Sequence, residues 1–289
     1  MCAVRLEIYG TVRNKHTREK CSEQRATLSR AETSASFRAI TPASTEMMQT
    51  PSAPLASVRP RTRLVVSIEG NIGIGKSTLL ANLRKHYAGD TRVAFVDEPV
   101  GLWEEHGLLA AMYSNSISRC AFQLMAVTTR YTALLRALES GASLIITERS
   151  LHSDRHCFAS VNLQAAADIS AYAVTHEALV NSLPDDISLG TVMLRVPRAV
   201  LHQRIAKRAR AAEADAANDS GGIPDAYLER LDNAHARYYE MCEEGAKHAV
   251  DATAPPAQVA AAVIDAIEAL DASKSPSSPL SVMDSMQLA

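Results

Sequence analysis

The sequence lacks several features that would place it in a specialised class. It contains no run of about 18 uninterrupted apolar residues, so a membrane-spanning helix is not expected. Its five cysteines are an odd number without a C-x-x-C pair, which argues against a disulfide framework or zinc knuckle and favours a reducing compartment. Charged residues make up 21% against 47% hydrophobic residues, a balance that excludes wholesale disorder, collagen and a coiled-coil rod.

The larger part of the chain has no excess of positive charge. Residues 1–63 hold 11 Lys and Arg against 5 Asp and Glu, whereas residues 64–289 hold 19 against 27 and are acidic overall. An extended basic surface is the usual footprint of a nucleic-acid-binding protein. We therefore predict neither a nucleic-acid nor a membrane partner.

The two ends of the chain have the composition of disordered segments. Residues 1–62 are basic, rich in Ser, Thr and Pro, and have no sustained hydrophobic period, so we predict disorder there. Glu7, Glu19 and Glu23 argue against an organelle transit peptide. We expect a cytoplasmic protein, with a mitochondrial location as the alternative if the leader is such a peptide. A disordered tail is also predicted over 272–289.

Between these ends, residues 63–271 alternate between strand and helix patterns and form one predicted domain. Strands are predicted at Leu64–Glu69, Arg92–Val96, Leu144–Thr147, Thr191–Val196 and, briefly, Ala249–Asp251. Helices are predicted at Thr78–Tyr87, Ser118–Ser140, Asp225–His248 and Gln258–Leu270. Strands separated by helices indicate βαβ units. The predicted fold is therefore α/β, with a parallel, five-stranded sheet flanked by helices.

A phosphate-binding motif follows the first strand. Residues 70–77 read G-N-I-G-I-G-K-S and fit G-x-x-x-x-G-K-[ST] between a strand and a helix. Its glycines let successive backbone N–H groups face phosphate oxygens, at the positive end of a helix. This predicts a P-loop NTPase fold and an ATP-binding set of Gly70, Asn71, Ile72, Gly73, Ile74, Gly75, Lys76, Ser77 and Thr78.

The motif alone leaves a switch GTPase, a motor ATPase and a small-molecule kinase open. The guanine-specifying N-K-x-D is absent, and no hydrophobic strand ends in the single Asp usual in motors. Instead the next two strands are followed by Asp97-Glu98-Pro99 and by Glu148-Arg149. In such sheets ligands bind at the carboxyl ends of the strands. Glu148-Arg149 is therefore predicted to lie beside the phosphates rather than to form a surface ion pair.

A basic helix follows the fourth strand. Arg204 and Arg208 are four residues apart and share one helical face, while Arg210 points elsewhere. Such clusters are solvated surfaces in most proteins. In a P-loop protein they predict an arginine-rich lid that closes over ATP and stabilises the transferring phosphoryl group.

These motifs and several others resemble the deoxyribonucleoside kinases of the deoxycytidine, deoxyguanosine and insect multisubstrate kinase group. The resemblance runs from about residue 64 to 245, and the motifs occur in the family's order. The matching segments are EGNIGIGKST (69–78), DEPVGLW (97–103), AMYS (111–114), FQ-x6-R (122–130), TERSLHSDRHCFAS (147–160), RIAKRARAAE (204–213) and IPDAYLERL (223–231).

The resemblance implies transfer of the ATP γ-phosphate to the 5′-OH of a deoxyribonucleoside, with Mg²⁺. Glu98 is implied as the general base for the 5′-OH, and a carboxylate suffices because positioning and charge stabilisation carry most of this chemistry. Arg149 is implied to hold the 5′-oxygen and the phosphate charge, with Lys76 on the phosphates. Ser77 and Glu148 are the implied Mg²⁺ ligands.

The resemblance also implies a set of substrate contacts. Tyr113, beside Met112 in the AMYS segment, and Glu213 of the lid correspond to the residues that hold the sugar 3′-OH. A lid glutamate in this role would couple closure to a correct sugar. A homodimer through helices near 118–140 and 164–182 is implied in the same way.

The base pocket is implied by five further residues. Trp103 and Phe158 match positions that flank the base, with Phe158 stacking on it. Gln123 and Arg130 are seven apart on one helix and can share a face. Gln123 can read a base edge, and Arg130 with Asp154 resembles the deoxycytidine and deoxyguanosine kinase type. We predict deoxycytidine and purine deoxynucleosides over thymidine, because this pair takes the space that a thymine methyl needs.

Three alternatives remain at this point. One is thymidine kinase activity on the same scaffold. A nucleoside monophosphate kinase would need a basic pocket for a substrate phosphate, where this chain offers carboxylates and aromatics. A non-catalytic homologue acting as an assembly subunit would be expected to lose Lys76, Glu98 or Arg149, and all three are present.

Overall fold

The computed structural model describes residues 62–208 and 223–273. Within them lies a five-stranded sheet of order β2-β3-β1-β4-β5, in which every pair is parallel. The strands are β1 (Arg63–Glu69), β2 (Val93–Val96), β3 (Leu144–Glu148), β4 (Ile187–Arg195) and β5 (Lys247–Asp251). The predicted five-stranded parallel sheet is confirmed. Residues 1–61 and 274–289, where the sequence predicts disorder, lie outside the described residues.

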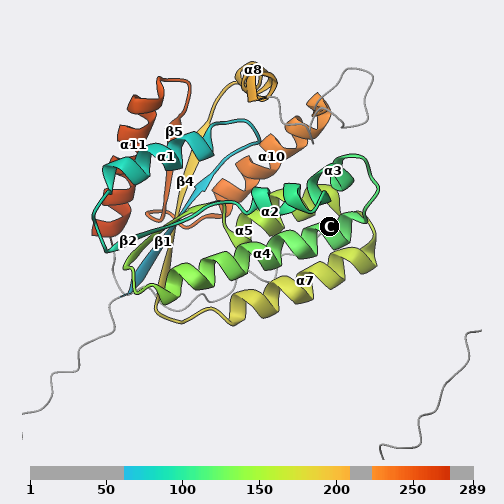
Figure 1. The fold of residues 1–289 in the computed structure, drawn as a ribbon, viewed down its shortest axis with the longest axis horizontal. Coiled ribbons are helices and arrows are strands. Elements are labelled where there is room, and N and C mark those ends of the chain that lie inside the picture. Colours follow the sequence, from blue (N-terminus) through green and yellow to red (C-terminus); the bar gives the residue numbers. More distant parts are fainter. Residues whose placement is uncertain (1–61, 209–222, 274–289) are drawn as a thin grey trace, which may run out of the picture. The chain divides into compact units, whose positions relative to one another are not determined.

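Helices cover both faces of the sheet because successive side chains of β1 point to opposite sides. Leu64, Val66 and Ile68 pack in one core with α1 (Lys76–His86) and α11 (Pro256–Ala272). Val65 packs on the other face with Leu134 and Leu138 of α4 (Arg119–Glu139). Figure 1 shows α1 and α11 together on one side, and α4 with α7 (Ala166–Asn181) on the other.

Several short helices surround the carboxyl end of the sheet. Two of them, α2 (Val100–Glu105) and α3 (Leu108–Tyr113), follow β2. A π-helix, η2 (Asp154–Ala159), lies between α5 (Leu151–Ser153) and α6 (Ser160–Asn162). None was predicted from the sequence, because elements of one or two turns show no hydrophobic period. The remaining long helices are α8 (Arg198–Arg208) and α10 (Asp225–Met241).

Two boundaries differ from the sequence prediction by more than two residues. The strand predicted from Thr191 begins at Ile187, where β4 already pairs with Arg63 of β1. Gly190 interrupts its apolar pattern, and a Cβ there would lie 3.0 Å from Leu270 Cδ1. The helix predicted over Asp225–His248 ends at Met241, because the chain must turn to pair Lys247 of β5 with Thr191.

Helix length bears on the membrane question. Over 62–208 and 223–273, no helix is both long enough and apolar enough to span a bilayer.

Candidate active site

A cleft opens where β1, β2 and β3 end. The structure brings a large share of the predicted site residues together on its walls. Those lining the cleft are Ile72, Gly73, Lys76, Ser77, Glu98, Trp103, Met112, Tyr113, Gln123, Arg130, Glu148, Arg149, Asp154, Phe158 and Arg208.

The phosphate loop has the backbone shape that its glycines allow. Gly70, Gly73 and Gly75 have φ values of 134°, 78° and 109°, a region that side chains disfavour. A Cβ on Gly73 would lie only 2.5 Å from Ile205 Cγ1 of α8. Asn71 fixes the loop from the other side, because its Nδ2 donates to the Leu228 carbonyl of α10 over 2.9 Å.

The loop lysine lies within the curl of the loop. Lys76 is buried, and its Nζ donates to the carbonyls of Gly70 and Asn71, each over 3.1 Å. Burial, followed by the charge of Arg149, lowers the pKa of Lys76 to about 7. A bound polyphosphate would bring negative charge next to the Lys76 amine and would favour its protonated form. Gly70, Asn71, Ile74, Gly75 and Thr78 belong to the loop or to α1 without lining the cleft.

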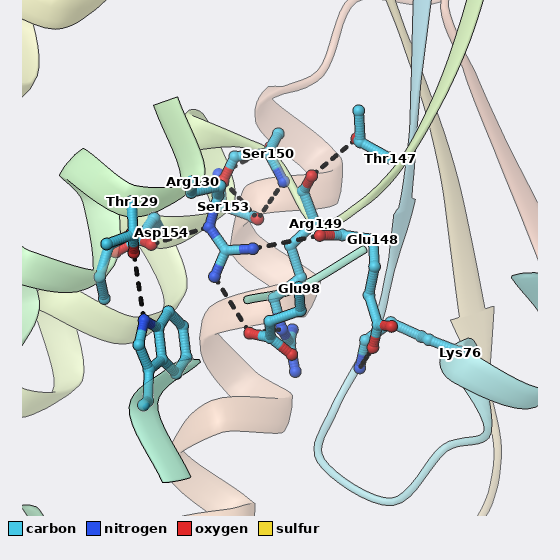
Figure 2. A network of polar contacts seen from close by, with 12 residues as sticks. Lys76, Glu98, Thr129, Arg130, Thr147, Glu148, Arg149, Ser150, Ser153 and Asp154 are labelled. Carbon is cyan, nitrogen blue, oxygen red and sulfur yellow. Dashed lines mark hydrogen bonds and ion pairs between the residues drawn. The ribbon is translucent and has the colours of Figure 1, made fainter. Parts of the chain in front are cut away.

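Glu98 lies between two guanidinium groups just after β2. Its Oε1 accepts from Arg130 Nη2 over 3.0 Å and from Arg149 Nε over 3.1 Å. Burial alone would raise its pKa, but Arg149, Arg130 and Lys76 together outweigh burial and lower the pKa to about 2. Figure 2 shows the carboxylate facing both arginines. Glu98 is therefore ionised and fixed in direction.

Arg149 follows β3 in a strained backbone conformation. Its φ is 69°, which is unusual for a residue other than glycine. Its guanidinium donates from Nη1 to the Gly70 carbonyl over 2.9 Å and lies 4.3 Å from the Phe158 ring centre. Backbone strain of this kind persists where surrounding contacts enforce it, and it is common at functional sites. In this backbone conformation the guanidinium of Arg149 lies over the phosphate loop.

Arg130 connects Glu98 with a second carboxylate. Its Nε donates to Asp154 Oδ2 over 3.0 Å, and all three side chains lie in one network in Figure 2. The other oxygen of Asp154 accepts from Tyr172 OH over 3.1 Å. Burial raises the pKa of Asp154, while the hydrogen bonds from Arg130 and Tyr172 favour its carboxylate form. Arg130 therefore connects the predicted pocket for the nucleobase with the predicted general base, Glu98.

An apolar wall closes the end of the cleft away from the phosphate loop. Trp103 is buried against Phe122, with ring centres 5.6 Å apart, and its Nε1 donates to Thr129 Oγ1 over 3.1 Å. Gln123 lies on the same helix as Arg130, and its Oε1 is buried without a hydrogen-bond partner. A buried acceptor of this kind is costly when unsatisfied, so it marks a position where a ligand donor would bind.

Oxygen atoms suited to a hard cation lie together near the loop. Ser77 Oγ donates to Glu148 Oε2 over 3.0 Å, and Lys76 Nζ lies 4.0 Å from Glu148 Oε1. The described ranges contain no cluster of three or more His, Cys, Asp or Glu that could enclose a metal by themselves. Mg²⁺ commonly takes one or two protein oxygens with substrate phosphates, and Ser77 with Glu148 fits that requirement.

The two described lid arginines differ in direction. Arg208 lines the cleft. Arg204 does not, because it donates to the Ile74 carbonyl over 2.6 Å and to the Ala252 carbonyl over 2.8 Å. It thereby joins α8 to the phosphate loop and to the segment after β5. Arg210 and Glu213 lie outside the described residues.

The sequence comparison decides the family. Residues 66–271 match the deoxynucleoside kinase family. The chain belongs to the deoxynucleoside kinase family. It is accordingly an ATP-dependent phosphotransferase with a P-loop NTPase fold, and the P-loop prediction is confirmed.

Named relatives of this kinase lie at about 30% identity. The chain is 32% identical over 186 residues to a probable deoxycytidine kinase of Fowlpox virus, covering 61% of this chain and 72% of the relative. It is 31% identical over 215 residues to deoxycytidine kinase 2 of Gallus gallus, covering 64% and 77%. A solved deoxyadenosine kinase of M. mycoides with bound dATP superposes with a TM-score of 0.56 at 24% identity, covering 71% and 98%. At this identity the solved structure supports the fold alone.

Sequence reasoning missed some residues of the kinase cleft. Val100, Leu109, Phe122, Ala126 and Tyr227 also line it. Tyr227 lies in the IPDAYLERL segment, so a signal was present, but no role was assigned to it. Val100 and Phe122 likewise lie in the DEPVGLW and FQ-x6-R segments without an assigned role. Leu109 and Ala126 had no signal beyond ordinary core patterning, since their place in the wall depends on how α2, α3 and α4 meet.

Proposed function

We propose that this kinase transfers the γ-phosphoryl group of ATP to the 5′-OH of a deoxynucleoside, preferring deoxycytidine and purine deoxynucleosides over thymidine. The observation that carries the proposal is the Glu98–Arg130–Asp154 network, with contacts of 3.0 Å at both ends of Arg130. Through this network the ionised carboxylate of Glu98, near the phosphate loop, is connected to the Arg130–Asp154 pair at the apolar end of the cleft. One nucleoside spans that distance with its 5′-OH at one end and its base at the other.

In this mechanism the 5′-oxygen attacks the γ-phosphorus while its proton passes to the Glu98 carboxylate, and the bond to the ADP oxygen breaks. A carboxylate with a pKa near 2 is a weak base. That is sufficient where the transition state is loose and the protein mainly positions reactants and stabilises charge. Lys76 and Arg149, which both donate to the Gly70 carbonyl, provide this stabilisation beside the phosphate loop.

Mg²⁺ belongs to the proposal as the partner of the nucleotide. Ser77 and Glu148 are the residues that would hold it, and the ion would offset the charge of the phosphate oxygens when bound. The lid residues Arg210 and Glu213 are proposed to reach the phosphates and the sugar 3′-OH on closure. Tyr113, which lines the cleft, is the proposed partner of Glu213 at that hydroxyl.

Base preference follows from the apolar end of the cleft. The unpartnered Gln123 Oε1 suits an exocyclic amino group, which cytosine and adenine carry and thymine lacks. Arg130 and Asp154 are buried and bonded to one another, so they occupy space beside that position. Arg149 already covers one face of Phe158, so a stacked base would use the opposite face of the ring.

The test is a steady-state panel of four deoxynucleosides with ATP and Mg²⁺. We expect the kcat/KM values for deoxycytidine, deoxyadenosine and deoxyguanosine to exceed the value for thymidine. A higher value for thymidine would overturn the preference. A rate of ATP turnover that does not depend on any nucleoside would overturn the proposed reaction itself.

A homodimer through α4 and α7 is part of the proposal. These helices pack against each other, and α7 exposes Val174, which is 69% accessible. Sedimentation of the full chain and of Val174→Glu tests this, with the variant expected to shift toward the monomer. If Val174→Glu sediments like the wild type, the interface does not include Val174.

A further inference from the structure

Arg149 depends on its neighbours for its direction. Its backbone is strained, and its long side chain has several rotatable bonds that favour no single pose. Its Nε donates to Glu98, the group that is proposed to receive the substrate proton. That contact must weaken as Glu98 takes up the proton. The guanidinium therefore needs other partners that do not take part in the reaction.

His235 of α10 is such a partner. Its ring is buried, with 4% of its surface exposed, and its Nε2 lies 3.4 Å from Arg149 Nη1 within hydrogen-bonding geometry. Its Nδ1 lies 2.7 Å from the carbonyl of Leu231, one helical turn earlier. The ring also meets Phe158 edge to face, with ring centres 5.7 Å apart. One imidazole thus touches the arginine and the aromatic ring beneath it.

The pairing of Nδ1 decides the tautomer. A carbonyl oxygen only accepts, so the proton lies on Nδ1 and Nε2 is left with a lone pair. Burial, followed by the positive charge of Arg149, lowers the pKa of His235 to about 3. At neutral pH the ring is an uncharged acceptor aimed at the guanidinium.

The helix that carries His235 also holds the phosphate loop. Asn71 of the loop donates to the Leu228 carbonyl of α10, two turns before His235. Arg149 donates to the Gly70 carbonyl of the same loop. The loop, Arg149 and α10 therefore form a closed set of contacts, in which His235 supplies the link between α10 and Arg149.

We propose that His235 is a positioning residue for phosphoryl transfer, holding the Arg149 guanidinium over the phosphate loop by accepting its hydrogen bond at Nε2. This rests on the role proposed above for Arg149. His235 does not touch the reacting atoms, and it acts through Arg149. A misplacement of about 1 Å in such a group can lower a rate by about 100-fold.

The test compares two replacements of His235. His235→Leu has similar bulk and no acceptor, and we expect its kcat to fall about 10- to 100-fold with KM values for deoxynucleoside and ATP within about threefold of wild type. His235→Gln keeps an acceptor near the position of Nε2, and we expect it to recover most of the lost kcat. If His235→Leu does not fold, His235→Met takes its place in the comparison.

Three results would overturn the proposal. A wild-type kcat in His235→Leu would remove the role. An equal loss in His235→Leu and His235→Gln would assign the effect to packing alone. His176→Leu is the matched control, because His176 is another buried histidine, bonded to the Leu151 carbonyl and not to Arg149. A loss of kcat in His176→Leu as large as in His235→Leu would also indicate general loss of packing.

Arg149→Lys, measured in parallel, separates this inference from the proposed function. A wild-type kcat in Arg149→Lys would remove Arg149 from the mechanism and the function of His235 with it. If Arg149→Lys loses kcat while His235→Leu keeps the wild-type kcat, only the proposed role of His235 is overturned.

Discussion

The guanidinium of Arg130 and the carboxylate of Glu98 meet at 3.0 Å, although they come from α4 and from the segment after β2. The same guanidinium reaches Asp154 over 3.0 Å and the Glu148 carbonyl over 3.1 Å. Burial favours loss of its proton, but Glu98 and Asp154 outweigh burial and raise its pKa. A single permanent charge therefore ties the proposed base-recognition end of the cleft to its reaction end.

Glu98→Gln tests the proposed base directly. The amide keeps the shape of Glu98 and cannot accept the 5′-OH proton, so kcat should fall by about 10²–10⁴-fold with smaller changes in KM. Glu105→Gln, at an exposed carboxylate at the end of α2, is the control and should retain wild-type kcat. A nucleoside-dependent rate that survives in Glu98→Gln would remove Glu98 from the proton transfer.

Replacing both members of the Arg130–Asp154 pair should change base selectivity. The double variant Arg130→Leu with Asp154→Ala leaves neither charge buried alone, which would otherwise cost about 3–5 kcal/mol. It frees space for a thymine methyl, so we expect the ratio of kcat/KM for thymidine to that for deoxycytidine to rise by about 10-fold or more. Arg136→Leu, an exposed arginine on α4, should leave the ratio unchanged. An unchanged ratio in the double variant would make the pair purely structural.

Gly73→Ala should damage the phosphate loop. A Cβ there lies 2.5 Å from Ile205 Cγ1, and φ at this position is 78°. The variant is expected to lose about 1–3 kcal/mol of unfolding free energy and to bind ATP more weakly. Gly101→Ala is the control, since no heavy atom lies within 4 Å of a Cβ at that position. Urea unfolding and the KM for ATP measure both effects, and equal behaviour of the two variants would contradict the prediction.

Acid should destabilise the fold through its buried histidines. Burial lowers the pKa of His176 to about 3, so between about pH 6.5 and pH 3 the unfolded chain binds a proton there that the folded protein does not. Stability is lost as pH falls through this window. From pH 7 to pH 5 this one group accounts for about 2 kcal/mol.

The His176 effect is measured by urea unfolding at pH 7 and pH 5. Wild type should lose about 2 kcal/mol more than His176→Gln over this interval. Val174→Ala, at an exposed position without a titratable group, provides the control and should differ from wild type by the same amount at both pH values. An equal loss in wild type and His176→Gln would refute the linkage.

Local patterns explain why much of the fold was predictable. The run of β-branched residues in β1, the glycine spacing after it and Lys76 are contiguous, so their structure follows from backbone geometry over a few residues. The order of strands and of the long helices other than α7 follows from hydrophobic periodicity in the same way. A helix at the position of α7 was implied only by the family resemblance. Boundaries failed at Ile187 and Met241, where pairing with a distant strand overrode the local pattern.

Other features could not be predicted, because they depend on contacts between distant segments. Arg204 donates to the backbone carbonyls of Ile74 and Ala252, and its place on a helical face did not indicate these contacts. The π-helix that carries Asp154 and Phe158 has no periodic signal of its own. His235 stands out only once α10 packs against Arg149.

By itself the sequence determined the class of chemistry and the order of the elements, because the phosphate motif and the alternation of strands and helices act over short stretches of chain. The tertiary structure alone decided which charges meet. Arg130, Arg149 and Glu98 are far apart along the chain, and only the parallel sheet brings their segments to one edge. There burial strengthens their interactions and fixes the direction in which each group acts.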